Sequence, residues 1–226
     1  MTRHGTGFTE KTFEFLDGLV ANNSREWFDE HRDVWESHVK DPFADLLEHL
    51  GERLAGTSLP VRGSAATMFR INRDLRFTDD PRPYSESVSG LLTESGTKAE
   101  STRLLYLELA PDVGRVGGGL HQASAATLRP VREHIVDHPA EVDALLAELD
   151  GAGIAFDMTD QVKTMPRGFA DHDDHPHVEL LRCTQLIAMR PLPMTCWLDD
   201  TIVERIVDAA PAFASLYDFF DEAEAG

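Results

Sequence analysis

Residues 103–111, RLLYLELAP, carry the clearest strand pattern in the chain. Successive side chains of a strand point to opposite faces, so a period of two separates a buried face from a more exposed one. The alternating sets here are Leu105, Leu107 and Leu109 on one face and Leu104, Tyr106 and Glu108 on the other. The segment therefore predicts a strand with one face against an apolar core.

Residues 66–74, ATMFRINRD, show the same alternation, with Phe69 and Ile71 on one side and Arg70 and Asn72 on the other. This pattern predicts a second strand. A third is expected in LIAMRPLP at 186–193, whereas DVGRVGGGL at 112–120 is typical of a glycine-rich turn.

Helical periodicity dominates both ends of the chain. In residues 8–20, FTEKTFEFLDGLV, apolar side chains recur at helical spacing after a Thr9 cap, and Asn23 is expected to cap a second helix. Pro42 is expected to kink that helix or to start a new turn before 43–56. Further helices are expected around Leu128 to Ile135 and over 139–149, 178–182, 199–210 and 211–223.

These elements alternate too irregularly for a doubly wound parallel sheet. The sequence predicts an α+β fold with a small, mostly antiparallel central sheet flanked by helices at the N- and C-termini. The length of 226 residues and the absence of a linker favour a single α+β domain over 1–226.

Charge and composition restrict the partners that we expect. With 40 acidic and 21 basic residues, the net charge of -19 argues against nucleic acid, whose phosphates bind basic faces. There is no apolar run long enough for a membrane span and no export signal, so we expect a cytoplasmic protein with no membrane partner. Cys183 and Cys196 are expected to be buried free thiols.

Arginine is concentrated in residues 68–84, MFRINRDLRFTDDPRPY. Arg70 and Asn72, with Arg76 and Tyr84 beyond them, are candidates to bind a carboxylate or phosphate through planar guanidinium groups. The alternative is that the arginines pair with nearby carboxylates and hold a loop together. The sequence leaves both interpretations open.

Other segments offer further candidates. One interpretation is that backbone N–H groups bind an anion at the glycine triplet, Gly117, Gly118 and Gly119. The other is that these glycines let the chain pass close to another element. Three more cationic side chains are candidates to contact the same carboxylate or phosphate ligand: Lys163, Arg167 and Arg182.

The histidines of DHDDHPH are candidates for a metal site. Histidine and carboxylate side chains are ligands for Zn, Mn or Fe, and this stretch contains His172, His175 and His177. No metal-binding motif such as HExxH is present, and a polar loop that caps the following helix explains the same residues.

Four blocks in order resemble the family known as domain of unknown function 2461: residues 8–28, 68–84, 106–120 and 162–182. The resemblance covers nearly the whole chain but implies no activity, cofactor or catalytic residue. The matching positions include Arg70, Asn72, Arg73, Asp74, Pro83, Tyr84, Gly117 to Gly119 and Pro166 to Phe169. The family usually has lysines where this chain has Asp79, Pro81 and Ser85.

Taken together, the sequence predicts a protein that binds a small phosphorylated or carboxylated ligand in an arginine-lined cleft. The alternatives are a metal-assisted hydrolase and a non-enzymatic module that binds another protein. The sequence identifies no cofactor and no protein partner.

Overall fold

The computed structural model describes residues 6–99 and 102–226. The helices α1 (Glu10–Asn22) and α2 (Arg25–Glu30) lie near the N-terminus, and α1 buries Phe13, Leu16 and Leu19. Ser24 caps α2, because its hydroxyl accepts the Trp27 N–H at 3.2 Å. The expectation that Asn23 caps this helix was wrong, since its side-chain amide binds the backbone of Tyr84 instead.

The chain remains helical through Pro42. The short α3 (Arg32–Val34) leads into a π-helix, η1 (Trp35–Lys40), and then into α4 (Asp41–Leu54), where Pro42 lies in the first turn. Proline is tolerated there because the first-turn N–H groups have no partner within the helix. The rings of Trp27 and His31 stack on each other, with their centroids 4.1 Å apart.

The sheet has five antiparallel strands in the order β1-β2-β3-β5-β4, which confirms the predicted α+β class. In β2 the predicted alternation holds, because Leu105, Leu107 and Leu109 are fully buried. Ser89 lies opposite Glu108, and Leu91 lies opposite Tyr106. The strands are β1 (Val88–Thr93), β2 (Leu104–Leu109), β3 (Val113–Leu120), β4 (Ala155–Phe156) and β5 (Leu186–Pro193).

Two expectations about strands were wrong. Residues 66–74 are not a strand: Met68 bridges Gly90 and Asn72 bridges Tyr84, while the turns η2 (Ala65–Thr67) and η3 (Leu75–Phe77) lie on either side. The expected glycine-rich turn is instead β3, where the glycines allow strands to pass closely.

The remaining helices lie in the second half of the chain. One helix, α9, continues through Pro211, so the expected break at this residue was wrong. Its buried side chains Ile206, Ala210, Phe213 and Leu216 form one apolar stripe across the proline, and packing of this stripe outweighs the lost N–H. The helices are α5 (Ala125–Asp137), α6 (Pro139–Gly151), η4 (Ala170–His172), α7 (Val178–Arg182), α8 (Met194–Leu198) and α9 (Ile202–Ala225).

Contacts divide the chain into two compact units. Unit 1 contains residues 1–116 and 191–208, and unit 2 contains residues 117–190 and 209–226. The single domain expected from the sequence stays a prediction. Cys183 and Cys196 are buried and are not joined in a disulfide, as predicted. Among the described residues, none of the helices is both long and apolar enough to span a bilayer.

Candidate functional site

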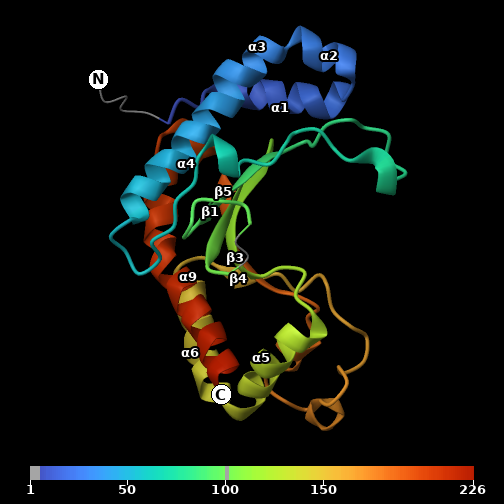
Figure 1. Ribbon diagram of the computed structural model, residues 1–226, viewed down its shortest axis with the longest axis vertical. Helices are drawn as coiled ribbons and strands as arrows, with labels where there is room; N and C mark the ends of the chain where they lie inside the picture. The colour runs from blue at the N-terminus through green and yellow to red at the C-terminus, as the bar shows by residue number, and fades with distance from the viewer. Residues whose placement is uncertain (1–5, 100–101) are drawn as a thin grey trace. The chain divides into compact units, whose positions relative to one another are not determined.

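The arginine-rich segment of unit 1 folds as a hairpin between residues 71 and 85. The Arg73 N–H donates to the Pro83 carbonyl at 2.9 Å, and the Ser85 N–H donates to the Ile71 carbonyl at 2.7 Å. Figure 1 shows this hairpin in teal, with the short η3 turn at its far end. Because the two arms are joined by backbone hydrogen bonds, they hold their side chains at defined positions.

Two arginines of the hairpin share one carboxylate. Arg73 Nη1 and Arg82 Nη2 each lie 2.6 Å from Asp80 Oδ2, and Arg82 also pairs with Glu86. The hydrogen bonds from Arg82 and then Arg73 lower the pKa of Asp80 far below its ordinary value. For Arg73 and Arg82 the structure therefore favours the structural interpretation.

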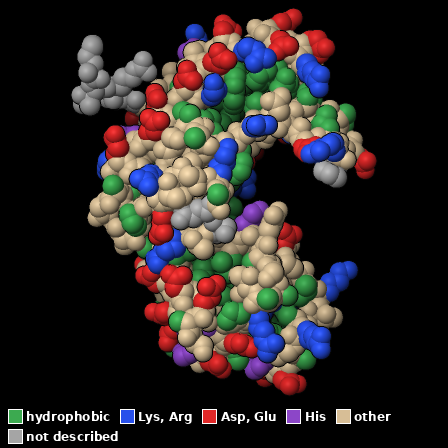
Figure 2. All heavy atoms as spheres, in the orientation of Figure 1, with side chains coloured by type: hydrophobic (Ala, Val, Ile, Leu, Met, Phe, Trp, Pro, Cys, Tyr) green, Lys and Arg blue, Asp and Glu red, His purple; other side chains and the backbone are tan. Residues whose placement is uncertain are grey.

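Arg76 and Arg70 differ in their surroundings. The Arg76 guanidinium forms a bidentate pair with Asp74, with Nη2 2.6 Å from Oδ2. Figure 2 shows basic and acidic side chains next to each other at the tip of this hairpin. Arg70 is exposed, and no carboxylate among the residues that the structure describes pairs with it. Among the arginines of 68–84 in the described residues, Arg70 is thus the one without a carboxylate partner.

Tyr84 and Asn72 face each other across the two arms of the hairpin. Their backbones form an antiparallel bridge, and Tyr84 is only 5% exposed, while Asn72 is exposed. The Tyr84 ring stacks on Phe28 at 4.2 Å, and Asn23 binds its backbone. These contacts give Tyr84 a structural role as the residue that fastens the hairpin to α2.

A lysine and two aromatic rings meet beside the start of the hairpin. Phe69 is 45% exposed, and its ring centroid lies 6.5 Å from that of Tyr106 on β2. Lys98 Nζ lies 5.9 Å from the centroid of Phe69 and donates to the Met68 carbonyl at 2.8 Å. We call Phe69, Lys98 and Tyr106 the aromatic platform.

The ammonium of Lys98 retains donors for a ligand. An ammonium has three N–H donors, and one of them binds the Met68 carbonyl. No carboxylate within the described ranges pairs with Lys98. The platform therefore combines an exposed ring with a cation whose position is fixed by the backbone.

The β2 end of the platform contains polar groups. Burial raises the pKa of Tyr106, whose side chain also hydrogen-bonds with Ser89 and Glu108. Glu108, two residues along the same face, lies 3.0 Å from Arg115 Nε through its Oε2. Pairing with Arg115 offsets the negative charge that Glu108 would otherwise place near an anion.

The glycine triplet lies in β3 within unit 2. A Cβ at Gly117 would lie 2.1 Å from Met189 Sδ, and a Cβ at Gly119 would lie 2.1 Å from the Leu186 carbonyl oxygen. The Gly119 N–H donates to the Tyr217 hydroxyl at 3.0 Å, so it is not an open donor. The close approach supports the interpretation that Gly117 and Gly119 are required by packing.

The predicted cations of unit 2 lie on a loop and on α7. Lys163 and Arg167 are exposed, and neither pairs with a carboxylate of residues 6–99 or 102–226. Arg182 lies 3.4 Å from Glu179, and its Nε is buried without a hydrogen-bond partner. The Val162 N–H donates to the Arg182 carbonyl at 2.9 Å, so the backbone of Lys163, the next residue, lies close to that of Arg182.

The histidines of 172–177 contact neighbouring groups of the protein itself. His175 Nδ1 accepts the His177 N–H at 3.1 Å, and His177 Nε2 lies 3.2 Å from both the Pro139 carbonyl and Asp143. His172 contacts Phe169 with ring centroids 6.3 Å apart. In the described part of the chain, the ligand atoms of these histidines do not form a group within 4.8 Å.

Sequence reasoning did not select the residues of the aromatic platform. Lys98 is one of only four lysines, and Phe69 adjoins Arg70, but nothing in the sequence indicates that they meet. The feature of the sequence that could have indicated the platform is the aromatic side chain of Phe69 within a segment rich in charged residues.

Comparison with known proteins identifies a family. The model of a family described as conserved hypothetical protein, domain of unknown function 2461, matches residues 11–219. None of the curated proteins compared with the chain matches it. Since this match spans nearly all of the 226 residues, the chain belongs to the family known as domain of unknown function 2461.

Proposed function

We propose that unit 1 binds a small phosphorylated or carboxylated ligand at the aromatic platform, with Lys98 as its main anion contact and Arg70, the residue after Phe69, as a second cation. The observation that carries the proposal is the position of Lys98 Nζ, 5.9 Å from an exposed ring and bonded to the Met68 carbonyl at 2.8 Å. An ordered ammonium binds an anion at a lower entropy cost than a freely moving side chain.

The exposed ring favours a ligand with a flat or apolar part next to its anionic group. Phe69 leaves 45% of its surface in water, which is a cost unless something covers it. Stacking on an aromatic ring contributes about 0.5–1.5 kcal/mol beyond burial.

Isothermal titration calorimetry with inorganic phosphate and phenyl phosphate tests this proposal. Phenyl phosphate is expected to bind the parent protein more tightly than phosphate, by roughly two- to tenfold, because of the ring. Lys98→Ala is expected to weaken both ligands by roughly ten- to a hundredfold, since a charged hydrogen bond contributes about 1.5–3 kcal/mol. Phe69→Leu is expected to remove only the advantage of phenyl phosphate.

Arg76→Ala is the matched control. It removes an exposed arginine of the same segment whose guanidinium already pairs with Asp74, so binding should stay at the parent level. Equal binding of phenyl phosphate to the parent and to Lys98→Ala, or no binding to the parent, would overturn the proposal.

A second candidate function is the binding of another protein. Phe69 and Leu75 are both large apolar side chains that are more than a third exposed, at 45% and 39%, on the same segment. Such side chains are enriched in protein interfaces when they cluster. A partner of this kind would lose affinity with Leu75→Ser and would not respond to phosphate.

A further inference from the structure

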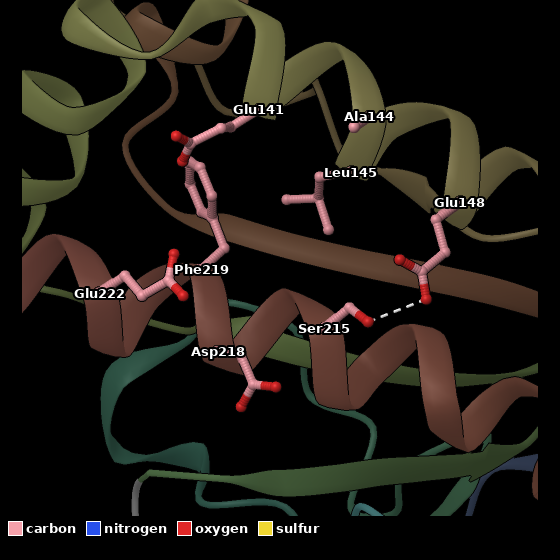
Figure 3. Close-up of a pocket in the computed structure, with 8 residues that line it drawn as sticks. All are labelled: Glu141, Ala144, Leu145, Glu148, Ser215, Asp218, Phe219 and Glu222. Carbon is pink, nitrogen blue, oxygen red and sulfur yellow. Dashed lines mark hydrogen bonds between the residues drawn. The ribbon is translucent and has the colours of Figure 1, made fainter.

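An open pocket of unit 2 lies between α6 and the C-terminal half of α9. Figure 3 shows the facing helices, with Glu141 and Glu222 at one end beside the ring of Phe219. At the other end Ser215 donates to Glu148 at 2.8 Å, which joins the two helices. The lining residues are Glu141, Ala144, Leu145, Glu148, Ser215, Asp218, Phe219 and Glu222.

A histidine joins the two glutamates at the first end of this pocket. The ligand atoms of His134, Glu141 and Glu222 all lie within 4.8 Å of one another. They come from the last turn of α5, the first turn of α6 and the end of α9. His134 Nε2 lies 3.3 Å from Glu141 Oε2. Two ligands around a tetrahedral ion with bonds of about 2.0–2.1 Å are separated by roughly this distance.

The geometry is not that of a simple hydrogen-bonded pair. His134 Nε2 is buried and forms no hydrogen bond, although Glu141 Oε2 lies within ion-pair distance. A buried polar atom without a partner is costly and calls for an explanation such as an ion. The orphaned nitrogen faces two carboxylates, so a cation between them would satisfy all three groups.

The neighbouring rings fix the orientation of this histidine. His134 stacks on His138 with centroids 4.3 Å apart and meets the edge of Phe219 at 4.9 Å. His138 Nδ1 lies 3.2 Å from the other oxygen of Glu141. Contacts that orient the ligands of a metal are typical of metal sites, where they raise affinity.

We propose that His134, Glu141 and Glu222 bind a divalent transition-metal ion, for which Zn²⁺ is the natural probe. An imidazole ligand favours Zn²⁺ and its neighbours over Mg²⁺ or Ca²⁺, which prefer oxygen alone. Three protein ligands leave a fourth position of a tetrahedral ion for water. Glu141 and Glu222 are exposed, so an ion and a small molecule can reach that position from solvent.

Equilibrium dialysis of the untagged full chain against Zn²⁺, followed by metal analysis, tests this site. We expect about one bound ion per chain. Glu222→Gln keeps the size of an exposed side chain but removes its charge, and it is expected to weaken Zn²⁺ binding at least tenfold. Glu224→Gln, two residues further along the same helix, is the matched control and should bind like the parent.

Two further measurements separate this site from other histidines. Co²⁺ in place of Zn²⁺ should give visible absorption bands of a four-coordinate ion that disappear in Glu222→Gln. His175→Asn alters the loop of 172–177 and should leave binding unchanged. The proposal is overturned if the parent binds no Zn²⁺, if Glu222→Gln binds as tightly as the parent, or if His175→Asn is the variant that loses the ion.

Discussion

The side-chain amide of Asn23 binds both backbone polar groups of Tyr84. Its Oδ1 accepts the Tyr84 N–H at 3.0 Å, and its Nδ2 donates to the Tyr84 carbonyl at 3.1 Å. An amide that pairs with a peptide group in this way acts as one residue of a neighbouring strand. It fastens the hairpin of 71–85 to the turn between α1 and α2, with the Tyr84 ring packed on Phe28.

Removal of this amide is expected to destabilise unit 1. Asn23→Ala leaves the N–H and carbonyl of the buried Tyr84 without partners, so the free energy of unfolding should fall by about 1–3 kcal/mol. Urea denaturation followed by circular dichroism measures the loss. Asn22→Ala is the control, because that amide binds only the Gly18 carbonyl of its own helix and should cost much less.

The carboxylate of Asp80 makes stability depend on pH. Its hydrogen bonds from Arg82 and Arg73 lower its pKa in the folded protein below the unfolded value. The stabilisation is therefore fully present above the unfolded pKa of about 3.9 and is lost as the pH falls toward the folded value. At neutral pH, Asp80→Asn should lower the melting temperature, and the difference from the parent should shrink in acid.

The neighbouring Asp79 provides the comparison for this pH effect. It is exposed and pairs with no arginine or lysine in the described ranges. Asp79→Asn should therefore have the same melting temperature as the parent at every pH. A constant difference between Asp80→Asn and the parent down to pH 2 would show that the pair does not titrate as described.

The glycine at position 119 is expected to tolerate no side chain. Its φ of +131° lies in the region that L-residues avoid, and a Cβ would lie 2.1 Å from the Leu186 carbonyl oxygen. The backbone conformation alone costs on the order of 1–3 kcal/mol, and the clash adds to it. Gly119→Ala should lower the urea midpoint strongly, whereas Gly151→Ala, with open space and a helical position, should be neutral or stabilising. Similar midpoints for the two variants would contradict the close approach of these strands.

Local patterns predicted the α+β class and β2 because those features depend on neighbours along the chain. The three leucines of β2 alternate cleanly, and burial follows the alternation. The expectation at 66–74 failed because Met68 and Asn72 pair with different segments, which no local pattern reveals. The helix break expected at Pro211 is absent, because burial of the apolar stripe along the whole of α9 stabilises the helix by more than the proline destabilises it.

The candidate site depends even more on long-range contacts. Arg76 was a candidate ligand-binding residue in the sequence, yet it pairs with Asp74 of its own hairpin, as Arg73 and Arg82 pair with Asp80. Lys98 binds the carbonyl of Met68, thirty residues earlier in the chain. The predicted segment 68–84 therefore includes Phe69 and Arg70 of the proposed site but neither Lys98 nor Tyr106.

The most direct test of anion binding in unit 1 is a ¹⁵N nuclear magnetic resonance titration of the full chain with phenyl phosphate. Our account predicts that the largest shifts occur at the backbone amides of Phe69, Arg70, Lys98 and Tyr106, and that they vanish in Lys98→Ala. Shifts confined to the amides around Lys163 and Arg167, or no shifts at all, would contradict it.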